Sequence, residues 1–187
     1  RMTGTWHFEN DSIGIRKAEV GTFANNAYVI ACLKTAMSII VDAAADADRV
    51  EELADGTTPF AVYTTHGHAD HVGAAREIAE RFGIPVRLHR SDWDICPIEA
   101  DEAIEPGMLR LGEGLLEVRH TPGHTPGSTV IVTSGAALTG DTLFPGGPGA
   151  TRFPYSDFDQ IMDSLESRIF DLPDDTIVMP GHGPDTT

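Results

Sequence analysis

Short apolar runs, separated by polar turns that often contain Gly or Pro, dominate the hydrophobic pattern of this chain. Apolar runs of about four to eight residues are typical of β-strands that are buried or partly buried. On this basis strands are predicted over residues 13–20, 27–33, 36–41, 60–65, 86–89, 115–119, 128–133, 136–138 and 176–179.

Apolar residues recur at helical intervals in three segments, over residues 46–54, 72–82 and 158–169. Gly83 is placed to end the second helix, and Ser156, with Asp159 three residues later, is placed to begin the third. The acidic segment 91–107 gives no clear prediction. Because strands and helices do not alternate strictly, we expect one domain over residues 1–187, with two packed sheets and helices outside them.

The charge balance narrows the range of partners. The sequence carries 29 acidic residues against 13 Lys and Arg residues, a formal net charge of −16 at pH 7. This field repels phosphate backbones, so nucleic acid is not expected as a partner. The acidic excess lies partly in residues 42–55 and 92–105, where a solvated surface is the simpler interpretation and a specific partner site is the alternative.

No apolar segment approaches the length of a transmembrane helix, and no basic start precedes a signal-like apolar run. We therefore expect a cytoplasmic protein without a membrane partner. Cys32 lies in an apolar run and is interpreted as a small buried hydrophobe, whereas Cys96 lies in a loop-like stretch. Nothing in the sequence requires a disulfide between them or indicates the oligomeric state.

The most informative segment is residues 66–71, with the sequence HGHADH, which places four metal-binding side chains within six residues. It lies between a predicted strand and a predicted helix, a position where α/β proteins often keep their sites. Imidazole and carboxylate ligands suit zinc, with iron or manganese as alternatives. A solvated loop is the other interpretation, but packing gives no reason to gather three histidines and an aspartate there.

Three further loops carry candidate ligands. His124 lies in a Gly- and Pro-framed loop, Asp141 follows a short apolar run, and His182 lies in the segment PGHGP at 180–184. Each has an alternative interpretation: His120, four residues before His124, could be the ligand, Asp141 could cap a turn, and 180–184 could be a plain turn.

The candidates total five histidines and two aspartates. Divided between two ions that share one carboxylate, they give each ion three terminal ligands and leave a position for water, as in catalytic metal sites. The set comprises His66, His68, Asp70, His71, His124, Asp141 and His182.

Four motifs resemble the metallo-β-lactamase superfamily: HxHxDH at 66–71, TPGHT at 121–125, GDTLF at 140–144 and PGHGP at 180–184. The last two are similar to its glyoxalase II-like hydrolases. The resemblance implies an α+β fold, a four-layer αββα sandwich with the metals at one edge of the sheets. The TPGHT match also favours His124 over His120 as a ligand.

By position, the resemblance implies two sets of three ligands, namely His66, His68 and His124 for one divalent ion and Asp70, His71 and His182 for the other. Asp141 would bridge the ions, and Asp70 and Asp141 would take direct part in catalysis. Asp42 matches an aspartate that supports the ligand loop by hydrogen bonding, although it could simply cap the end of its strand.

The activity implied by the resemblance is hydrolysis of a small-molecule thioester by a hydroxide held between the ions. A bound metal lowers the pKa of water from 15.7 toward ~7, and a thiol with a pKa near ~8.5 is a good leaving group. The alternatives are a persulfide dioxygenase of the same superfamily, with a single iron at His66, His124 and Asp141, and a lactonase.

The sequence leaves two alternatives for the thiol part of the substrate. Glyoxalase II enzymes usually carry Lys or Arg where this chain has Ala150, so an acylated thiol other than glutathione is an alternative substrate. The Gly- and Pro-rich loop 144–153 is expected to shape the substrate entrance. Arg152, Tyr155 and Trp93 are the predicted substrate contacts.

Overall fold

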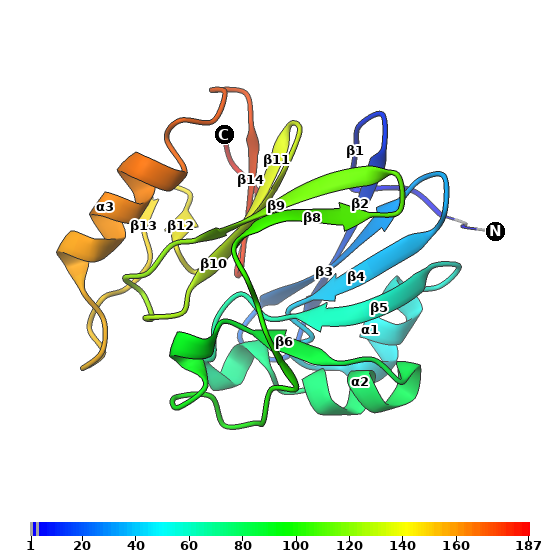
Figure 1. Cartoon of the computed structure of the whole chain (residues 1–187), viewed down its shortest axis with the longest axis horizontal. Helices are drawn as coiled ribbons and strands as arrows, with labels where there is room; N and C mark the ends of the chain where they lie inside the picture. The colour runs from blue at the N-terminus through cyan, green and yellow to red at the C-terminus, as the bar shows by residue number, and fades with distance from the viewer. Residues whose placement is uncertain (1, 3) are drawn as a thin grey trace.

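The computed structural model describes residue 2 and residues 4–187, which form two β-sheets packed face to face (Figure 1). The larger sheet consists of β1 (Phe8–Glu9), β2 (Ile13–Val20), β3 (Asn25–Cys32), β4 (Met37–Val41), β5 (Thr58–Tyr63), β6 (Val86–Leu88) and β7 (Glu102–Ala103), in that spatial order. The smaller sheet consists of β8 (Gly107–Leu111), β9 (Gly114–His120), β10 (Thr129–Thr133), β11 (Ala136–Gly140) and β14 (Ile177–Pro180), in the order β14-β11-β10-β9-β8. A separate hairpin joins β12 (Leu143–Phe144) and β13 (Gly147–Pro148).

Strand β3 shows how the pattern of the sequence builds the layers. Its residues alternate between two apolar clusters: Tyr28, Ile30 and Cys32 face the smaller sheet, whereas Ala27 and Val29 face the helices. All eight residues of β3 are buried, because the sheet is covered on both faces. The interpretation of Cys32 as a buried hydrophobe is therefore confirmed.

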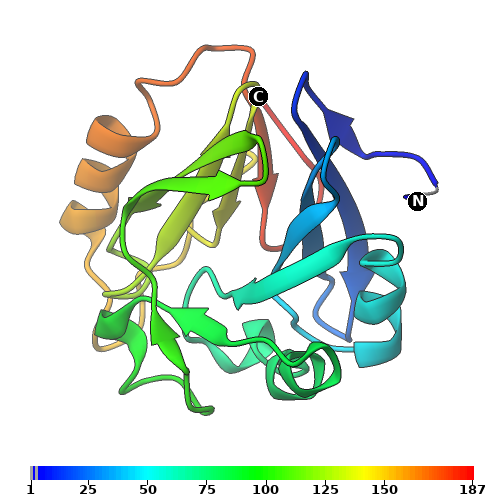
Figure 2. The ribbon, with the colours of Figure 1, turned by 45° about the vertical axis from the view of Figure 1, so that its right-hand side comes forward.

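The helices cover the outer face of each sheet. Helices α1 (Ala47–Leu53) and α2 (Ala75–Phe82) pack on the larger sheet, where Val50 and Ile78 join Val62 of β5 in one cluster. Helix α3 (Phe158–Arg168) packs on the smaller sheet, where Leu165 contacts the cluster around Val130. Figure 2 shows the resulting succession of helix, sheet, sheet and helix, which confirms the predicted αββα sandwich.

The core between the sheets contains fully buried aliphatic side chains from both of them, including Leu116 of β9. We expect Leu116→Ala to lower the free energy of unfolding by about 2–5 kcal/mol, because the side chain leaves a cavity that its neighbours fill only in part. Urea unfolding measures the loss. The neighbouring Leu115 is 48% exposed, so Leu115→Ala should change stability by less than ~0.5 kcal/mol, and equal losses would contradict this account.

The N-cap of helix α3 lies one residue later than the sequence indicates. Ser156 was predicted as its N-cap, but the carboxylate of Asp157 accepts the hydrogen bond from Gln160 N at 3.0 Å. Ser and Asp are both good N-caps, and here the Ser156 hydroxyl donates instead to the carbonyl of His124 at 2.7 Å. The N-cap prediction is therefore wrong, because a tertiary contact takes up the serine. The predicted helix end at Gly83 is confirmed, with a φ of 65°.

Strand β8 had no counterpart in the predicted elements. Only Leu109 and Leu111 of this strand pack toward the core, which is too few for a clear pattern. Its assignment depends on antiparallel pairing with β9, in which Leu111 lies opposite Gly114. Such a pairing depends on two segments at once, so the sequence of one segment alone does not predict it.

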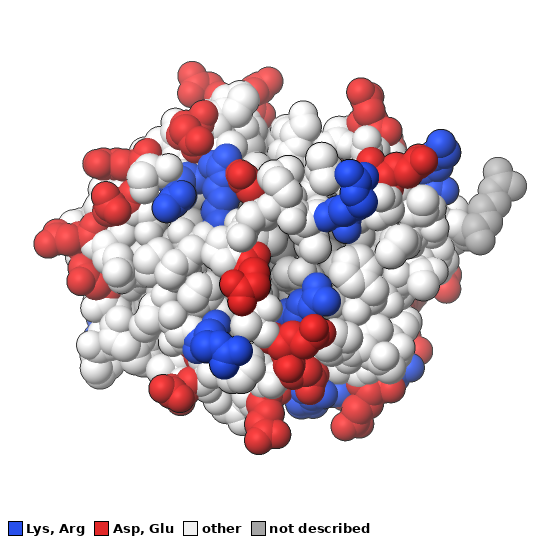
Figure 3. Space-filling view, viewed as in Figure 1, with Lys and Arg blue, Asp and Glu red and all other residues white. Residues whose placement is uncertain are grey.

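The surface carries the charge that the composition indicates. In Figure 3 acidic side chains are spread over the drawn face, and basic side chains lie in small separate groups among them. Arg81 illustrates this arrangement, because its guanidinium pairs with Asp48 at 2.8 Å and Glu51 at 2.6 Å. Within the described part of the chain, no helix combines the length and apolar character needed to cross a membrane.

Candidate metal centre

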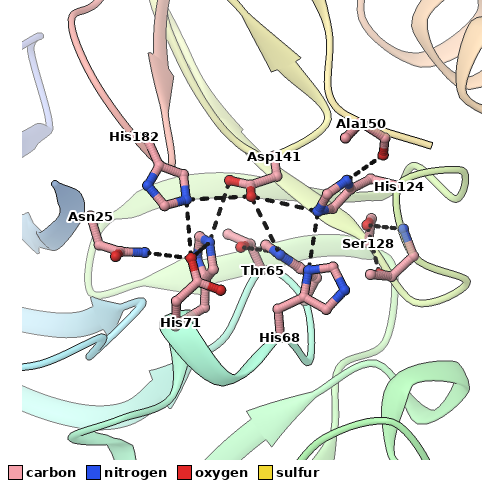
Figure 4. Close-up of polar contacts among 12 residues, drawn as sticks. Asn25, Thr65, His68, His71, His124, Ser128, Asp141, Ala150 and His182 are labelled. Atoms are coloured by element: carbon pink, nitrogen blue, oxygen red, sulfur yellow. Dashed lines mark hydrogen bonds and ion pairs between the residues drawn. The ribbon is translucent and has the colours of Figure 1, made fainter. Parts of the chain in front are cut away.

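The fold brings all seven candidate ligands to one edge of the two sheets (Figure 4). The segment 66–71 follows β5, the loop carrying His124 joins β9 to β10, and Asp141 and His182 follow β11 and β14. Strands β4 and β5 are parallel, as are β11 and β14, so the loops after each pair leave the sheet at the same end. This arrangement explains how residues from position 66 to position 182 meet in space.

Asp141 lies at the centre of the cluster. Its Oδ2 is 3.7 Å from His66 Nε2, 3.5 Å from His124 Nε2 and 3.4 Å from His182 Nε2. Its Oδ1 is 3.4 Å from His71 Nε2. Because both oxygens face histidine nitrogens, this carboxylate is placed between two groups of side chains.

The two groups are those that the sequence indicates. One comprises His66, His68 and His124, with His68 Nδ1 and His124 Nε2 at 3.2 Å. The ligand atoms within each group lie within 4.8 Å of one another.

The second group comprises Asp70, His71 and His182. Here Asp70 Oδ2 is 3.2 Å from His182 Nε2 and 3.5 Å from His71 Nε2. A further combination, His66 with His71 and Asp141, connects the two groups.

Hydrogen bonds donated by ring nitrogens that point away from the cluster orient two of the histidine rings. His124 Nδ1 donates to the carbonyl of Ala150 at 2.6 Å, and His182 Nδ1 donates to the carbonyl of Phe23 at 2.9 Å. A carbonyl can only accept, so each ring carries a proton on Nδ1, and in the neutral form of each ring the lone pair on Nε2 points into the cluster.

Asp42 lies behind the 66–71 loop. Its Oδ1 accepts from Thr65 N at 2.7 Å, and its Oδ2 accepts from Thr65 Oγ1 at 2.7 Å and His71 Nδ1 at 2.8 Å. Because Thr65 gives its hydroxyl proton to Asp42, its oxygen accepts from His66 Nδ1 at 3.1 Å. Asp42 therefore orients two rings of the cluster at once, and we propose that this is its role.

Three atoms of the cluster test whether it suits a metal. Among the side chains that the structure describes, His66 Nε2, His71 Nε2 and Asp141 Oδ1 are buried and have no hydrogen-bond partner. Leaving such an atom unsatisfied costs about 1–3 kcal/mol. These three atoms face one another. Nitrogen and carboxylate donors of this kind suit zinc, iron or manganese. The residues present therefore fit divalent metal ions.

The cluster also shifts proton affinities in the metal-free protein. Hydrogen bonds to Asp141 and Asp70 raise the pKa of His182 to about 10. Burial disfavours the charged form of His71, but the carboxylates of Asp42 and Asp141 raise its pKa above the usual value. Although burial opposes ionisation of Asp141, His182 and His71 hold the pKa of its carboxyl well below its usual range. Protonated histidines thus balance the carboxylates where metal ions would do so.

The predicted substrate contacts are placed differently from one another. Tyr155 OH lies 2.6 Å from His68 Nε2, and its ring stacks on Phe153 with centroids 5.7 Å apart. The guanidinium of Arg152 lies 5.0 Å from the Phe153 ring centroid. Trp93 Nε1 donates to the carbonyl of Leu88, and Arg90 covers its ring at 4.4 Å. Tyr155 and Arg152 thus adjoin the cluster, while no observed contact joins Trp93 to it, and its substrate role stays a prediction.

The three other histidines, His7, His89 and His120, lie outside the cluster. His120 Nε2 donates to the carbonyl of Pro126 at 2.8 Å, and its ring stacks on His89 with centroids 4.0 Å apart. His7 pairs with Asp185. The structure therefore brings His124 into the cluster and leaves His120 beside it.

Sequence reasoning missed three side chains that support the ligand loops. Asn25 Nδ2 donates to Asp70 Oδ2 at 3.1 Å, Asn26 Nδ2 donates to the carbonyl of Pro180 at 3.0 Å, and Tyr28 OH donates to the same carbonyl at 2.7 Å. Two consecutive asparagines at the start of a fully buried strand were the available signal, because buried amides need partners.

Comparison with known proteins identifies the family. The family model of the metallo-beta-lactamase superfamily matches residues 20–182. The chain is 33% identical over 193 residues to the probable metallo-hydrolase YqgX of Bacillus subtilis, covering 91% of this chain and 90% of the relative. It is 32% identical over 173 residues to the hydroxyacylglutathione hydrolase GloC of Haemophilus influenzae, covering 79% and 81%.

Solved structures agree with the family match. The crystal structure of the BLEG-1 B3 metallo-beta-lactamase superposes with a TM-score of 0.85 at 30% identity, covering 92% of this chain and 93% of that chain. TTHA1623, crystallised in a di-iron-bound form, superposes with a TM-score of 0.81 at 30% identity, covering 92% and 94%. With the αββα sandwich and the histidine and aspartate cluster at its edge, these matches show that the chain belongs to the metallo-beta-lactamase superfamily.

Proposed function

We propose that this protein is a metal-dependent hydrolase that cleaves a small-molecule thioester. The observation that carries the proposal is the convergence of three buried, unpartnered ligand atoms, His66 Nε2, His71 Nε2 and Asp141 Oδ1, at one sheet edge. The substrate class is supported by the similarity to GloC, whose name describes hydrolysis of an acylated glutathione.

The residues that would hold the metals follow from the geometry. His66, His68 and His124 would hold one ion, and Asp70, His71 and His182 the other. Asp141 faces both groups and would contact both ions. Zinc is our first expectation, while the di-iron form of TTHA1623 supports iron as an alternative. When bound, such ions would lower the pKa of water toward ~7 and polarise the carbonyl of the substrate.

The chain itself supplies a positioned hydrogen-bond donor beside the cluster. With a metal ion held at Nδ1 of His68, the ring proton would be on Nε2, which would donate to Tyr155 OH. The phenol proton is then free to bond an oxygen of the substrate. Partial burial raises the pKa of Tyr155, so this group keeps its proton at neutral pH. The role of Tyr155 is therefore to orient the acyl group.

Arg152 and Phe153 extend the wall next to Tyr155. The ring of Phe153 lies 4.7 Å from the ring of His68, so it excludes water from that side of the cluster. Arg152, which lies over Phe153, offers a positive charge in a protein of net charge −16. A thioester whose thiol part carries a carboxylate would be attracted to this position.

A second candidate activity has its own structural support. His66 and His124 lie 3.7 and 3.5 Å from Asp141 Oδ2, so two histidines and one carboxylate could hold a single iron. This ligand set is the one used by non-haem iron oxygenases. A mononuclear iron persulfide dioxygenase is therefore the alternative to the hydrolase, with a lactonase as a less supported third.

The discriminating experiment combines metal analysis with two assays on the same preparation. We expect about two ions per chain, thiol release from S-lactoylglutathione or another acyl thioester, and no oxygen uptake with glutathione persulfide. One iron per chain with oxygen uptake would establish the dioxygenase instead. A β-lactam and a lactone complete the substrate panel, and cleavage of either without thioester cleavage would replace the proposed substrate class.

A further inference from the structure

A second buried carboxylate, Asp92, lies behind the cluster and contacts two of its loops. Asp92 is 0% exposed and ends the short 3₁₀ turn Arg90–Asp92 that follows β6. Its Oδ2 accepts from Gly67 N at 2.8 Å and from Thr125 Oγ1 at 2.6 Å, and its Oδ1 accepts from Gly127 N at 2.6 Å. None of these contacts was indicated by the sequence, in which residues 91–107 gave no clear prediction.

The two loops come from different sheets. Gly67 lies between His66 and His68, after β5 of the larger sheet, whereas Thr125 follows His124 in the loop between β9 and β10 of the smaller sheet. One carboxylate thus bonds the chain next to all three histidines of one candidate metal group. The distance between the loops sets the spacing of His68 and His124 across the group.

The loops are built to approach Asp92 closely. A Cβ at Gly127 would lie 2.7 Å from Asp92 Cγ, and a Cβ at Gly67 would lie 3.0 Å from the Asp92 carbonyl oxygen. Both distances are shorter than ordinary Cβ contacts. The absence of a side chain at these two positions therefore lets their backbone N–H groups reach the Asp92 carboxylate. These contacts give Gly67 and Gly127 a physical reason.

The groups that face Asp92 also require a carboxylate. Two are backbone N–H groups, and Thr125 Oγ1, which contacts Ser128 Oγ at 2.8 Å, gives its own proton to Asp92. A side chain with four acceptor positions and no donor meets all three. An amide in the same place would turn its NH₂ group toward a backbone N–H on one side or the other.

We propose that Asp92 is a positioning residue for the metal group formed by His66, His68 and His124. Its carboxylate bonds Gly67 N, Thr125 Oγ1 and Gly127 N, so it acts on the group through Gly67 and Thr125. The inference rests on the proposed metal-binding role of the three histidines and is independent of the substrate. Residues that hold metal ligands from behind in this way typically change metal affinity by 10–100-fold when they are replaced.

The test is titration of metal-free protein with cobalt(II), followed by its visible absorption and by the number of ions bound per chain. We expect wild type to bind two ions and Asp92→Asn to bind one of them about 10–100-fold more weakly. Asp101→Asn is the control, because Asp101 accepts from Val86 N at 2.8 Å in the same part of the chain but contacts no histidine loop. It should bind both ions as wild type does.

Double variants assign the weakened site. In a His182→Ala background the remaining complete group is His66, His68 and His124, so adding Asp92→Asn should weaken the remaining ion. In a His124→Ala background the same change should have no effect on the ion that remains. An effect in the second background but not in the first would overturn the proposal.

A milder pair of substitutions keeps the test decisive if Asp92→Asn does not fold. Thr125→Val removes one hydrogen bond to Asp92 and should lower the affinity for the same ion. Thr125→Ser keeps the hydroxyl and should bind that ion as tightly as wild type does. Unchanged binding of both ions in Asp92→Asn or Thr125→Val, even with a lower thermal midpoint, would show a merely structural role. Binding of fewer than two ions by wild type would instead overturn the proposed dinuclear hydrolase.

Discussion

Replacement of Asp141 by Asn is expected to lower the rate of hydrolysis by at least ~10³-fold while the protein stays folded. This carboxylate faces all four histidine Nε2 atoms that point into the centre, from His66, His71, His124 and His182. Asn keeps the shape but removes the negative charge that would hold the two ions together. Metal ions contribute several kcal/mol to such reactions, and roughly 4 kcal/mol corresponds to ~10³-fold in rate.

The measurement is kcat/KM for thioester hydrolysis, with metal content and far-ultraviolet circular dichroism determined on the same sample. Asp163→Asn is the matched control, because it makes the same chemical change on the exposed face of α3. It should keep full activity. Unimpaired turnover by the Asp141→Asn protein would remove Asp141 from the proposed centre.

Removal of the metal ions with a chelator is expected to abolish turnover, and readdition of zinc, iron or manganese is expected to restore it. The affinity should also depend on pH. In the metal-free protein His182 keeps its proton up to about pH 10, so an ion that binds at pH 8 must displace that proton. The affinity of the group formed by Asp70, His71 and His182 should therefore rise with pH and level off near 10.

Calorimetric titrations at pH 8 in two buffers with different ionisation enthalpies measure the protons released. We expect at least one proton per ion bound at this group, and fewer protons released after His182→Ala, because His71, whose pKa is also raised, stays in the group. Full turnover by the metal-depleted protein would contradict the metal requirement. Metal affinity that rises as the pH falls would contradict the proposed proton displacement.

Both predictions depend on distances that the chain achieves only after folding. The chemistry of the centre was nevertheless accessible from the sequence, because each ligand lies in a short motif with a distinctive composition. HGHADH at 66–71 is identified as a candidate metal-binding segment without tertiary information, since its candidate ligands are neighbours along the chain. The pairing of His124, Asp141 and His182 with this segment required either the motif resemblance or the structure.

Local periodicity likewise determined most of the layers. Strand β3 and the first two helices were predicted because residues two, three or four positions apart meet on one face of a strand or helix. Local periodicity did not predict features that depend on a choice between neighbouring residues or on contacts between distant segments. Ser156 and Asp157 are both capable N-caps, and only the contact of Ser156 with the His124 carbonyl decides between them.

The sequence by itself therefore indicated a metal centre, the αββα layering and the candidate ligands. Only the tertiary structure decided how those ligands are held. Asp92 lies 25 residues from Gly67 and 33 from Thr125, in a segment without periodicity, yet it contacts both. Hydrogen bonds between distant segments leave no regular spacing along the chain, because they depend on the packing of two sheets against each other.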